Sequence, residues 1–175
     1  MTRAPARSTR AAPRPTRVWA ARDLERGAPA PDTALLLDTH LWLWYLEDAS
    51  SRWAAPLTRV LDACAEQGRL HVCDISVWEV ARQSATGKLR LSLPLDLWLD
   101  RAAQAVGVRF LPLTHPILRL APRLGDEDAP LHKDPADRML IAAAQVHGLP
   151  LATCDAAIIA YAHAHGGTPC CDARP

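Results

Sequence analysis

The stretch ALLLD, residues 34–38, decides the fold because it is a short apolar run that ends on an acidic residue. Its three consecutive leucines are too few for a helix and suit a buried strand. The stretch LATCD, residues 151–155, repeats this design near the other end of the chain. Two such strands, with helical patterns between them, predict an α/β fold built on a parallel sheet.

Further strands are expected in the compact apolar runs LHVCDI and VRFLPL, at residues 70–75 and 108–113. The stretch LWLWYL, residues 41–46, is ambiguous because its alternation also suits a strand that continues from residue 35. The clearest helix follows Asp134, since Pro135 suits a first helical position and Gly148 suits a helix end. Helices are expected at about residues 53–67, 76–86, 95–106, 115–121, 135–147 and 156–164.

Charge divides the chain into two regions. Residues 1–33 hold seven arginines against three acids, in an Arg-, Ala- and Pro-rich composition without the apolar core of a secretory signal. We expect a disordered extension at 1–33 and one domain at 34–172. A start codon assigned too far upstream would explain the extension equally well, whereas Pro5, Pro13 and Pro15 disfavour the amphipathic helix of a transit peptide. The rest of the chain holds 13 basic and 16 acidic residues, so a polyanion must be recruited by local basic side chains or a metal.

Several classes of protein lose support from the composition. No stretch approaches the roughly 18 apolar residues of a membrane span, so we expect a soluble protein with no membrane partner. The five cysteines form no CxxC pair and no zinc spacing, which favours free thiols in a reducing cytoplasm. The glycine motifs of dinucleotide and P-loop enzymes are also missing from the sequence.

Four acidic residues stand where strands turn into helices, which is where open parallel sheets carry their working groups. They are Asp38, Glu79, Asp137 and Asp155. Each also suits a helix cap; Ser76 and Glu79, for example, fit a capping box. Taken singly, the cap is favoured. Together, crowded carboxylates repel by several kcal/mol at an effective dielectric constant of about 20, and a helix dipole offsets only about 0.3 to 1 kcal/mol.

A divalent cation would remove this repulsion. Oxygen ligands select hard cations such as Mg²⁺ or Mn²⁺ over zinc. Such an ion lowers the pKa of bound water and stabilises charge on a leaving oxygen. The sequence therefore favours phosphodiester hydrolysis.

Four strings resemble, in order and spacing, the PIN-domain ribonucleases of the VapC toxin type. They are LLLDTHLWLW (35–44), ISVWEVARQSATGKLRL (75–91), HKDPADRMLIAAA (132–144) and GLPLATCDAAIIAY (148–161). The resemblance covers about residues 34–172. It implies a PIN-like three-layer α/β/α domain with a central parallel sheet, in which residues 41–46 belong to the first helix.

The same resemblance implies an activity and partners. The activity is Mg²⁺- or Mn²⁺-dependent cleavage of RNA, often of tRNA loops, inhibited by a VapB-like antitoxin, and homodimers are typical. The metal-binding carboxylates of the family match Asp38, Glu79, Asp137 and Asp155. The extension at residues 1–33 departs from the family pattern.

Other polar residues are candidates for supporting roles. Asp134 could bind the metal directly or support a ligand, although a helix cap is favoured for it. Thr39 and Thr153 could orient metal-bound water or a phosphate, although hydrogen bonding to the backbone is favoured for both. His40 and His132 could shuttle protons, but packing is favoured for both. Candidate RNA contacts are Arg82, Lys88, Arg90, Lys133 and Arg138. The alternative is that these side chains are only solvated surface residues or, for Arg138, that it forms a structural ion pair.

The aromatic group Trp42, Trp44, Tyr45 and Trp53 suits a core, with exposure at a dimer or antitoxin surface as the alternative.

Two other functions remain open. One is a PIN nuclease for housekeeping RNA processing or for DNA, and the other is an RNA-binding module without turnover. A haloacid-dehalogenase-like phosphatase is disfavoured because it needs a second Asp where this chain has His40. A receiver domain is disfavoured because paired acids near the first strand are missing.

Overall fold

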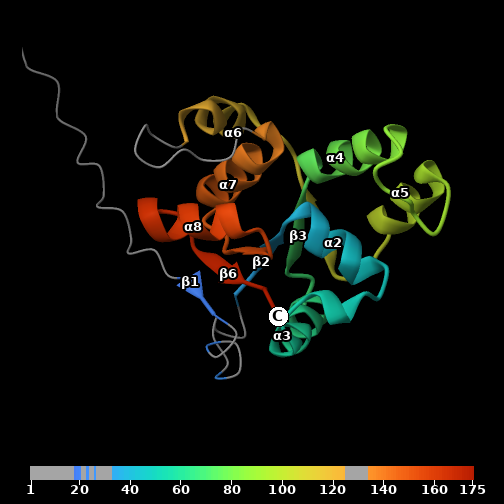
Figure 1. Cartoon of the computed structure of the whole chain (residues 1–175), viewed down its shortest axis with the longest axis horizontal. Helices are drawn as coiled ribbons and strands as arrows, with labels where there is room; N and C mark the ends of the chain where they lie inside the picture. Colours follow the sequence, from blue (N-terminus) through green and yellow to red (C-terminus); the bar gives the residue numbers. More distant parts are fainter. Residues whose placement is uncertain (1–17, 21–22, 24–25, 27–32, 125–133) are drawn as a thin grey trace, which may run out of the picture.

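A computed structural model describes residues 18–20, 23, 26, 33–124 and 134–175. Its strands form one six-stranded sheet in the order β1-β6-β5-β2-β3-β4, with every neighbouring pair parallel (Figure 1). The strands are β1 (Val18–Trp19), β2 (Leu35–Leu37), β3 (Leu70–Cys73), β4 (Val108–Leu111), β5 (Leu151–Thr153) and β6 (Cys170–Asp172).

Helices connect these strands, as parallel pairing requires. The α-helices are α2 (Thr39–Leu46), α3 (Ala55–Glu66), α4 (Asp74–Ala85), α5 (Leu95–Ala103), α6 (His115–Leu120), α7 (Pro135–His147) and α8 (Ala156–His165). Two short 3₁₀ turns, η1 (Ser50–Arg52) and η2 (Ala121–Arg123), follow α2 and α6.

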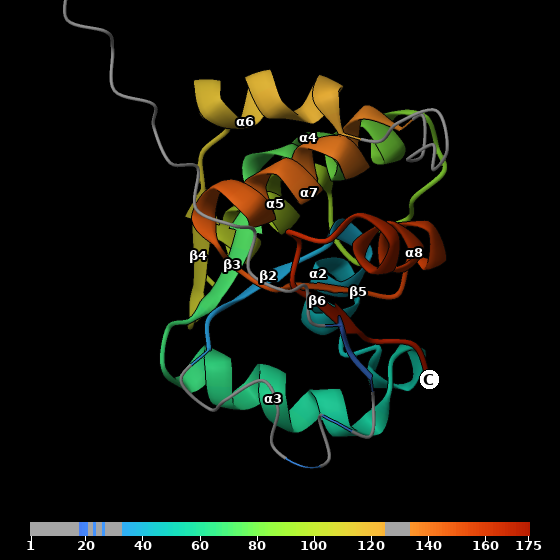
Figure 2. The ribbon, with the colours of Figure 1, turned by 90° about the vertical axis from the view of Figure 1, so that its left-hand side faces the viewer.

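Helices cover both faces of the sheet (Figure 2), and a hydrophobic core lies on each face. Leu35 and Leu37 of β2 pack with residues of α2, α3 and α5, whereas Leu36 packs with residues of α6, α7 and α8. All three leucines are fully buried. Successive strand residues point to opposite faces, so a run of three leucines suits a strand covered by helices on both sides. The three-layer α/β/α fold predicted from the sequence is confirmed.

Most predicted elements are present, and several of their limits differ; the strand predicted at 108–113 ends at Leu111, and the helix predicted at 95–106 ends at Ala103. Residues 41–46 lie within α2, which settles their ambiguity in favour of a helix. The strand predicted at 70–75 ends at Cys73, because Asp74 and Ile75 already belong to α4. The helix predicted from residue 76 therefore begins two residues earlier.

Two strands on one side of the sheet were not predicted. Strand β6 continues the sheet beyond β5, and β1 pairs with β6 through Val18 opposite Cys170 and Trp19 opposite Cys171. Val18 and Trp19 fall inside the predicted extension, most of which lies outside the described residues. The domain boundary at residue 34 stays a prediction, although the sheet includes two residues before it.

All five cysteines are free, as predicted, and four of them are buried. Burial raises the pKa of the Cys171 thiol to about 12, with the nearby Asp172 acting in the same direction. Within the described ranges, no helix is long and apolar enough to cross a membrane.

Candidate active site

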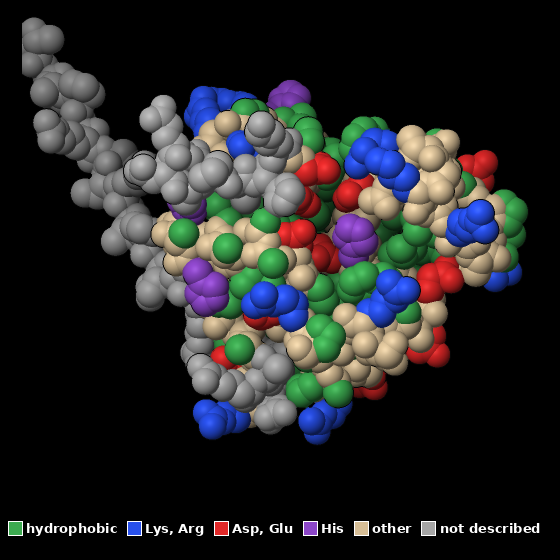
Figure 3. Space-filling model, viewed as in Figure 1, with side chains coloured by type: hydrophobic (Ala, Val, Ile, Leu, Met, Phe, Trp, Pro, Cys, Tyr) green, Lys and Arg blue, Asp and Glu red, His purple; other side chains and the backbone are tan. Residues whose placement is uncertain are grey.

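Five carboxylates line one pocket of about 210 Å³ at the carboxyl edge of the sheet. Four of them are the acids singled out from the sequence, and the fifth is Asp134. Leu140 and Ile158 form an apolar part of the wall, and Thr39 and His40 complete the lining. Figure 3 shows acidic side chains gathered around a hollow near the centre of this face. The fold thus brings together residues from the starts of α2, α7 and α8 and from the second turn of α4.

Asp38 lies between β2 and α2 and is only 3% exposed. Its Oδ1 accepts a hydrogen bond of 2.6 Å from the backbone N–H of Leu41 and so caps α2, while its Oδ2 accepts one from the Thr153 hydroxyl. Burial raises the pKa of the Asp38 carboxyl, and these hydrogen bonds offset the rise in part. A buried carboxylate of this kind is costly to ionise unless a cation stands beside it.

Asp155 caps α8 with one oxygen. Its Oδ1 accepts hydrogen bonds from the backbone N–H groups of Ala157 and Ile158, at 2.7 and 3.0 Å. Among the described residues, no hydrogen bond is donated to Oδ2. The Thr153 hydroxyl oxygen accepts a 2.9 Å bond from the backbone N–H of Asp155 and donates its own proton to Asp38. Thr153 therefore connects the two acids at neighbouring strand ends.

Glu79 does not serve as a helix cap, so the capping-box interpretation of Ser76 and Glu79 is wrong. Because α4 begins at Asp74, Glu79 lies in its second turn. Glu79 is 6% exposed, and its Oε1 accepts a 3.0 Å bond from the Gln83 side chain. Ser76 is fully buried and accepts a 3.0 Å hydrogen bond from the Thr39 hydroxyl. Thr39 thus joins the start of α2 to α4 beside the pocket.

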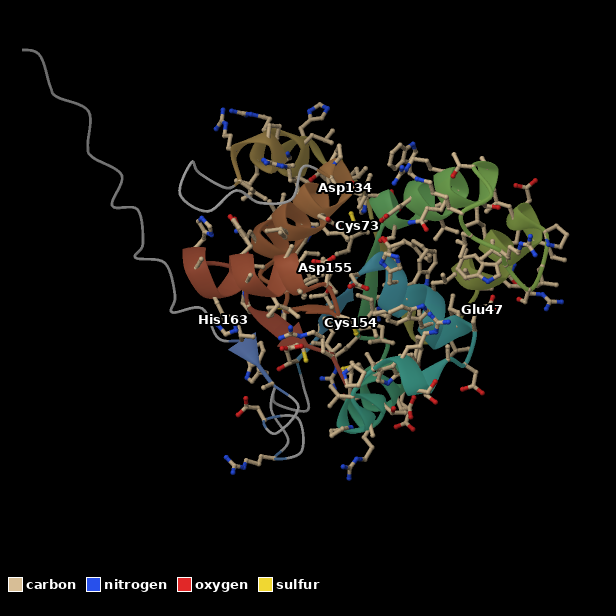
Figure 4. All side chains as sticks on the ribbon, viewed as in Figure 1. Glu47, Cys73, Asp134, Cys154, Asp155 and His163 are labelled. Carbon is tan, nitrogen blue, oxygen red and sulfur yellow. The ribbon has the colours of Figure 1, made fainter. Side chains whose placement is uncertain are left out.

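Asp134 and Asp137 divide two roles at the start of α7. Asp134 is the N-cap, as favoured from the sequence, and its Oδ1 accepts a 2.9 Å bond from the backbone N–H of Ala136. Its Oδ2 lies 3.9 Å from the Arg82 guanidinium. Asp137, one turn along, lines the pocket. Figure 4 shows Asp134 and Asp155 at the starts of α7 and α8.

The predicted RNA-contacting cations either do not line this pocket or lie outside the described residues. The Arg82 guanidinium lies 5.2 Å from the Trp78 ring centroid, and Arg138 donates a 2.7 Å hydrogen bond to the Leu124 carbonyl. Lys88 and Arg90 are exposed beyond the end of α4. Of these four residues, none lines the pocket. Lys133 and His132 lie outside the described residues.

The donor set fits a hard divalent cation because five carboxylates line the pocket wall. In the ranges that are described, no three acidic, histidine or cysteine side chains already stand close enough together to hold an ion. The carboxylates instead surround a shared space. Asp38 and Asp155 each commit one oxygen to a cap, so a single carboxylate can serve both a helix and a site.

A second cavity, of about 260 Å³, adjoins the first and was not predicted. It is lined by Asp38, His40, Trp44, Cys154 and Asp155, three of which also line the carboxylate pocket. The sequence signal was the spacing of His40 and Trp44, because residues four apart lie on one face of a helix. Of the aromatic group, Trp42 and Trp53 are buried in the core, whereas Trp44 and Tyr45 are half-buried.

Comparison with known proteins gives a consistent result. The family model "PIN domain" matches residues 35–167. The curated protein "Ribonuclease VapC22" from Mycobacterium tuberculosis is 29% identical over 135 residues, which cover 75% of this chain and 94% of that protein.

Among solved structures, VapBC2 from Rickettsia felis, bound to a promoter DNA fragment, is similar with a TM-score of 0.58 and 13% identity. That match covers 79% of this chain and 97% of the other. FitAcB from Neisseria gonorrhoeae is similar with a TM-score of 0.53 and 18% identity, over 78% of this chain and 95% of the other. At these identities the structural likeness shows the fold alone.

Proposed function

Since the chain belongs to the PIN-domain family, we propose that it is a metal-dependent endoribonuclease of the VapC toxin type. It would hydrolyse phosphodiester bonds of RNA, with tRNA or another structured RNA as substrate. Four carboxylates from distant segments of the chain, lining one pocket at the sheet edge, carry this proposal. The similarity to a protein named as a ribonuclease supports it.

The carboxylates of Asp38, Glu79, Asp137 and Asp155 would hold Mg²⁺ or Mn²⁺. When bound, the ion would supply a water of lowered pKa and stabilise charge on the leaving oxygen. Thr153 fixes the orientation of Asp38 through its hydroxyl, and Thr39 positions the neighbouring end of α4 through Ser76. The apolar side chains of Leu140 and Ile158, which line the pocket, would limit the access of bulk water to the carboxylates.

The decisive experiment is cleavage of total RNA by the purified protein in Mg²⁺, Mn²⁺ or EDTA. We expect fragments with either ion and none in EDTA. The variants Asp38→Asn and Asp137→Asn should lose cleavage by at least about a hundredfold, as expected when a group that stabilises transition-state charge is removed.

Asp96→Asn is the matched control for Asp137→Asn. Asp96 also lies in the first turn of a helix, but it is exposed on α5 and does not line the pocket. Its substitution should leave cleavage unchanged. Cleavage that persists in Asp38→Asn would indicate a contaminating nuclease. Bound but uncut RNA in every metal would favour a binding module without turnover, and cleavage of DNA as well would favour a general PIN nuclease.

A VapB-like antitoxin and a second copy of the chain are the proposed protein partners. Support for the antitoxin comes from the VapBC2 and FitAcB structures to which the fold is similar. Co-expression with the product of an adjacent small reading frame should give a complex that no longer cleaves RNA. Light scattering of the free chain should give twice the monomer mass of 19.1 kDa. A monomer at micromolar concentration would contradict the homodimer.

A further inference from the structure

The second cavity combines aromatic walls with direct access to the carboxylate pocket. We propose that it is a nucleobase subsite, which receives one unpaired base of an RNA chain whose neighbouring phosphate lies among the carboxylates. This inference rests on the proposed function and names how its substrate is recognised. Asp38, His40 and Asp155 line both spaces. A base in the second cavity and a phosphate in the carboxylate pocket would therefore belong to the same RNA strand.

Trp44 and His40 supply the stacking surface. Their ring centroids lie 5.9 Å apart and their planes are tilted by 46°, so the two rings form adjacent walls and not a closed stack. Aromatic side chains bind unpaired bases by stacking, and histidine and tryptophan both serve. The Arg52 guanidinium lies over the Trp44 ring, 5.4 Å from its centroid, and adds positive charge on that face of the ring.

The cavity wall is anchored to the fold. Trp44 packs against the core cluster that α2 and α3 form with the sheet, and so does Cys154. The Cys154 thiol also lies 3.8 Å from the backbone carbonyl oxygen of Arg52, to which it donates a weak hydrogen bond. This contact links the end of β5 to η1. Figure 4 shows Cys154 next to Asp155, between α8 and α2. A stacking platform held in this way is ordered before RNA binds.

Size and chemistry favour a base over other occupants. About 260 Å³ is below the roughly 300 to 1,000 Å³ of sites for drug-sized ligands, which suits one base and not an extended ligand. A phosphate is disfavoured here because the wall formed by Trp44 and Cys154 is apolar. A base has flat apolar faces and an edge that hydrogen-bonds, which match aromatic walls beside polar groups.

The subsite can be tested by binding alone, with fluorescein-labelled single-stranded oligoribonucleotides in EDTA and the same sequences as blunt duplexes. Trp44→Leu should weaken single-strand binding by about 5-fold to about 100-fold, the range expected for one stacked base. Duplex binding should not change, because paired bases cannot enter the cavity. Trp44→Phe keeps a ring and should fall between wild type and Trp44→Leu.

Trp78→Leu is the matched control. Trp78 is 51% exposed and carries the Arg82 guanidinium at 5.2 Å, much as Trp44 carries Arg52, but it does not line the cavity. It should bind single strands like the wild type. His40→Ala changes an exposed residue and so tests the same cavity if Trp44→Leu does not fold. It should also weaken single-strand binding selectively.

Cleavage identifies the nucleotide. Removing the base from one nucleotide at a time along a cleaved oligoribonucleotide should lower kcat/KM of the wild type most strongly at one position beside the cut. Trp44→Leu should lose that dependence, because the base has no partner left in this variant.

The failures of the two proposals are distinguishable. Equal single-strand binding by wild type, folded Trp44→Leu and His40→Ala would overturn the subsite even if the wild type cleaves RNA. Selective loss of single-strand binding in a protein that cleaves no RNA would support the subsite and reject the nuclease. Loss of antitoxin capture with unchanged RNA binding would make the cavity a protein-docking site and also overturn the proposal.

Discussion

Asp38 places a carboxylate at a buried position beside other acids, and burial raises its pKa. The folded state therefore holds its proton to higher pH than the unfolded state, whose aspartate titrates near pH 3.9. The contribution of Asp38 to the free energy of unfolding falls as pH rises from that value through the folded pKa. A metal-free site thus loses stability at neutral pH.

Asp38→Asn should accordingly melt at a higher temperature than the wild type in EDTA at pH 7, while its cleavage is lost. Asn caps a helix about as well as Asp, so the bond from Leu41 can remain. Each 1 kcal/mol gained raises the melting temperature by about 2 to 4 °C in a chain of this size. Thermal melts between pH 4 and 8 measure the effect, and a lower melting temperature than wild type in EDTA at pH 7 would contradict it.

Thr153 should matter through its hydroxyl and not through its volume. It is fully buried, donates to Asp38 and accepts from the backbone N–H of Asp155. Thr153→Val keeps the shape but leaves both groups without this partner, at a cost of about 1 to 3 kcal/mol. Cleavage should fall as well, because Asp38 is no longer oriented.

Thr153→Ser retains the hydroxyl and should preserve most of the cleavage activity. Urea unfolding and RNA cleavage rates compare the two variants. Equal stability and equal cleavage rates of Thr153→Val and Thr153→Ser would show that the hydroxyl contributes to neither.

The sequence predicted single residues well where a local rule applies. Asp134 caps α7 as favoured, since Pro135 and the acid before it define a helix start. Glu79 was misplaced within its helix because Ser76 imitates a cap, whereas the buried Cys73 is the true N-cap position. The cavity beside Trp44 was beyond prediction, since it forms only when η1 and the end of β5 meet α2.

At the scale of elements, Gly107 sets how closely the turn before β4 approaches α3. Its φ is +84°, and a Cβ placed there would lie 2.0 Å from the carbonyl oxygen of Ala65. Gly107→Ala should therefore add a steric clash to the left-handed strain of about 1 to 3 kcal/mol. Backbone cannot move aside as a flexible side chain can, so the loss in unfolding free energy should exceed that range.

Gly87→Ala isolates the strain. Gly87 has a φ of +70°, but nothing lies within 4 Å of the Cβ that would be added. Gly87→Ala should lower the free energy of unfolding only by the backbone strain, without a clash. Urea unfolding measures the loss for both glycine variants. Similar losses at the two glycines would mean that α3 and the turn can separate freely.

The sequence predicted elements correctly where specific residues mark the ends of a helix, and it missed the shortest strands. Pro135 and Gly148 mark the ends of α7, and its predicted range matches the structure. Strand β6 has only three residues and β1 only two, which is too short for periodicity to register. Both gain their structure from pairing with the existing sheet edge. Such tertiary pairing is not encoded in the local pattern.

At the scale of the whole molecule, the sheet gathers acids that are distant in sequence. Asp38 and Asp155 end the adjacent strands β2 and β5, so parallel pairing alone places them together. Their meeting was predictable because every strand was expected to run in one direction. The order of the strands and the volume of the pocket were not, since they depend on how α2, α4 and α7 pack across the sheet edge.

A divalent ion should reverse the order of stability between wild type and Asp38→Asn. Burial of the Asp38 carboxyl lowers the stability of the metal-free wild type as pH rises, and the same carboxylate would bind the ion. An ion at about 100 times its Kd adds about 2.7 kcal/mol, which corresponds to a rise of about 5 to 10 °C in melting temperature. Asp38→Asn starts from the higher melting temperature in EDTA but lacks one carboxylate, so its rise with Mn²⁺ should be much smaller.

Melting both proteins over a Mn²⁺ titration, with Asp96→Asn as the control variant, should give curves that cross. Asp96→Asn should follow the wild type because its side chain is exposed outside the pocket. Equal rises in melting temperature for wild type and Asp38→Asn would mean that the ion binds elsewhere, and would contradict a metal site in the carboxylate pocket. Crossing curves would instead show that the cost of the buried charge and the affinity for the ion arise from the same carboxylate, because one substitution would change both.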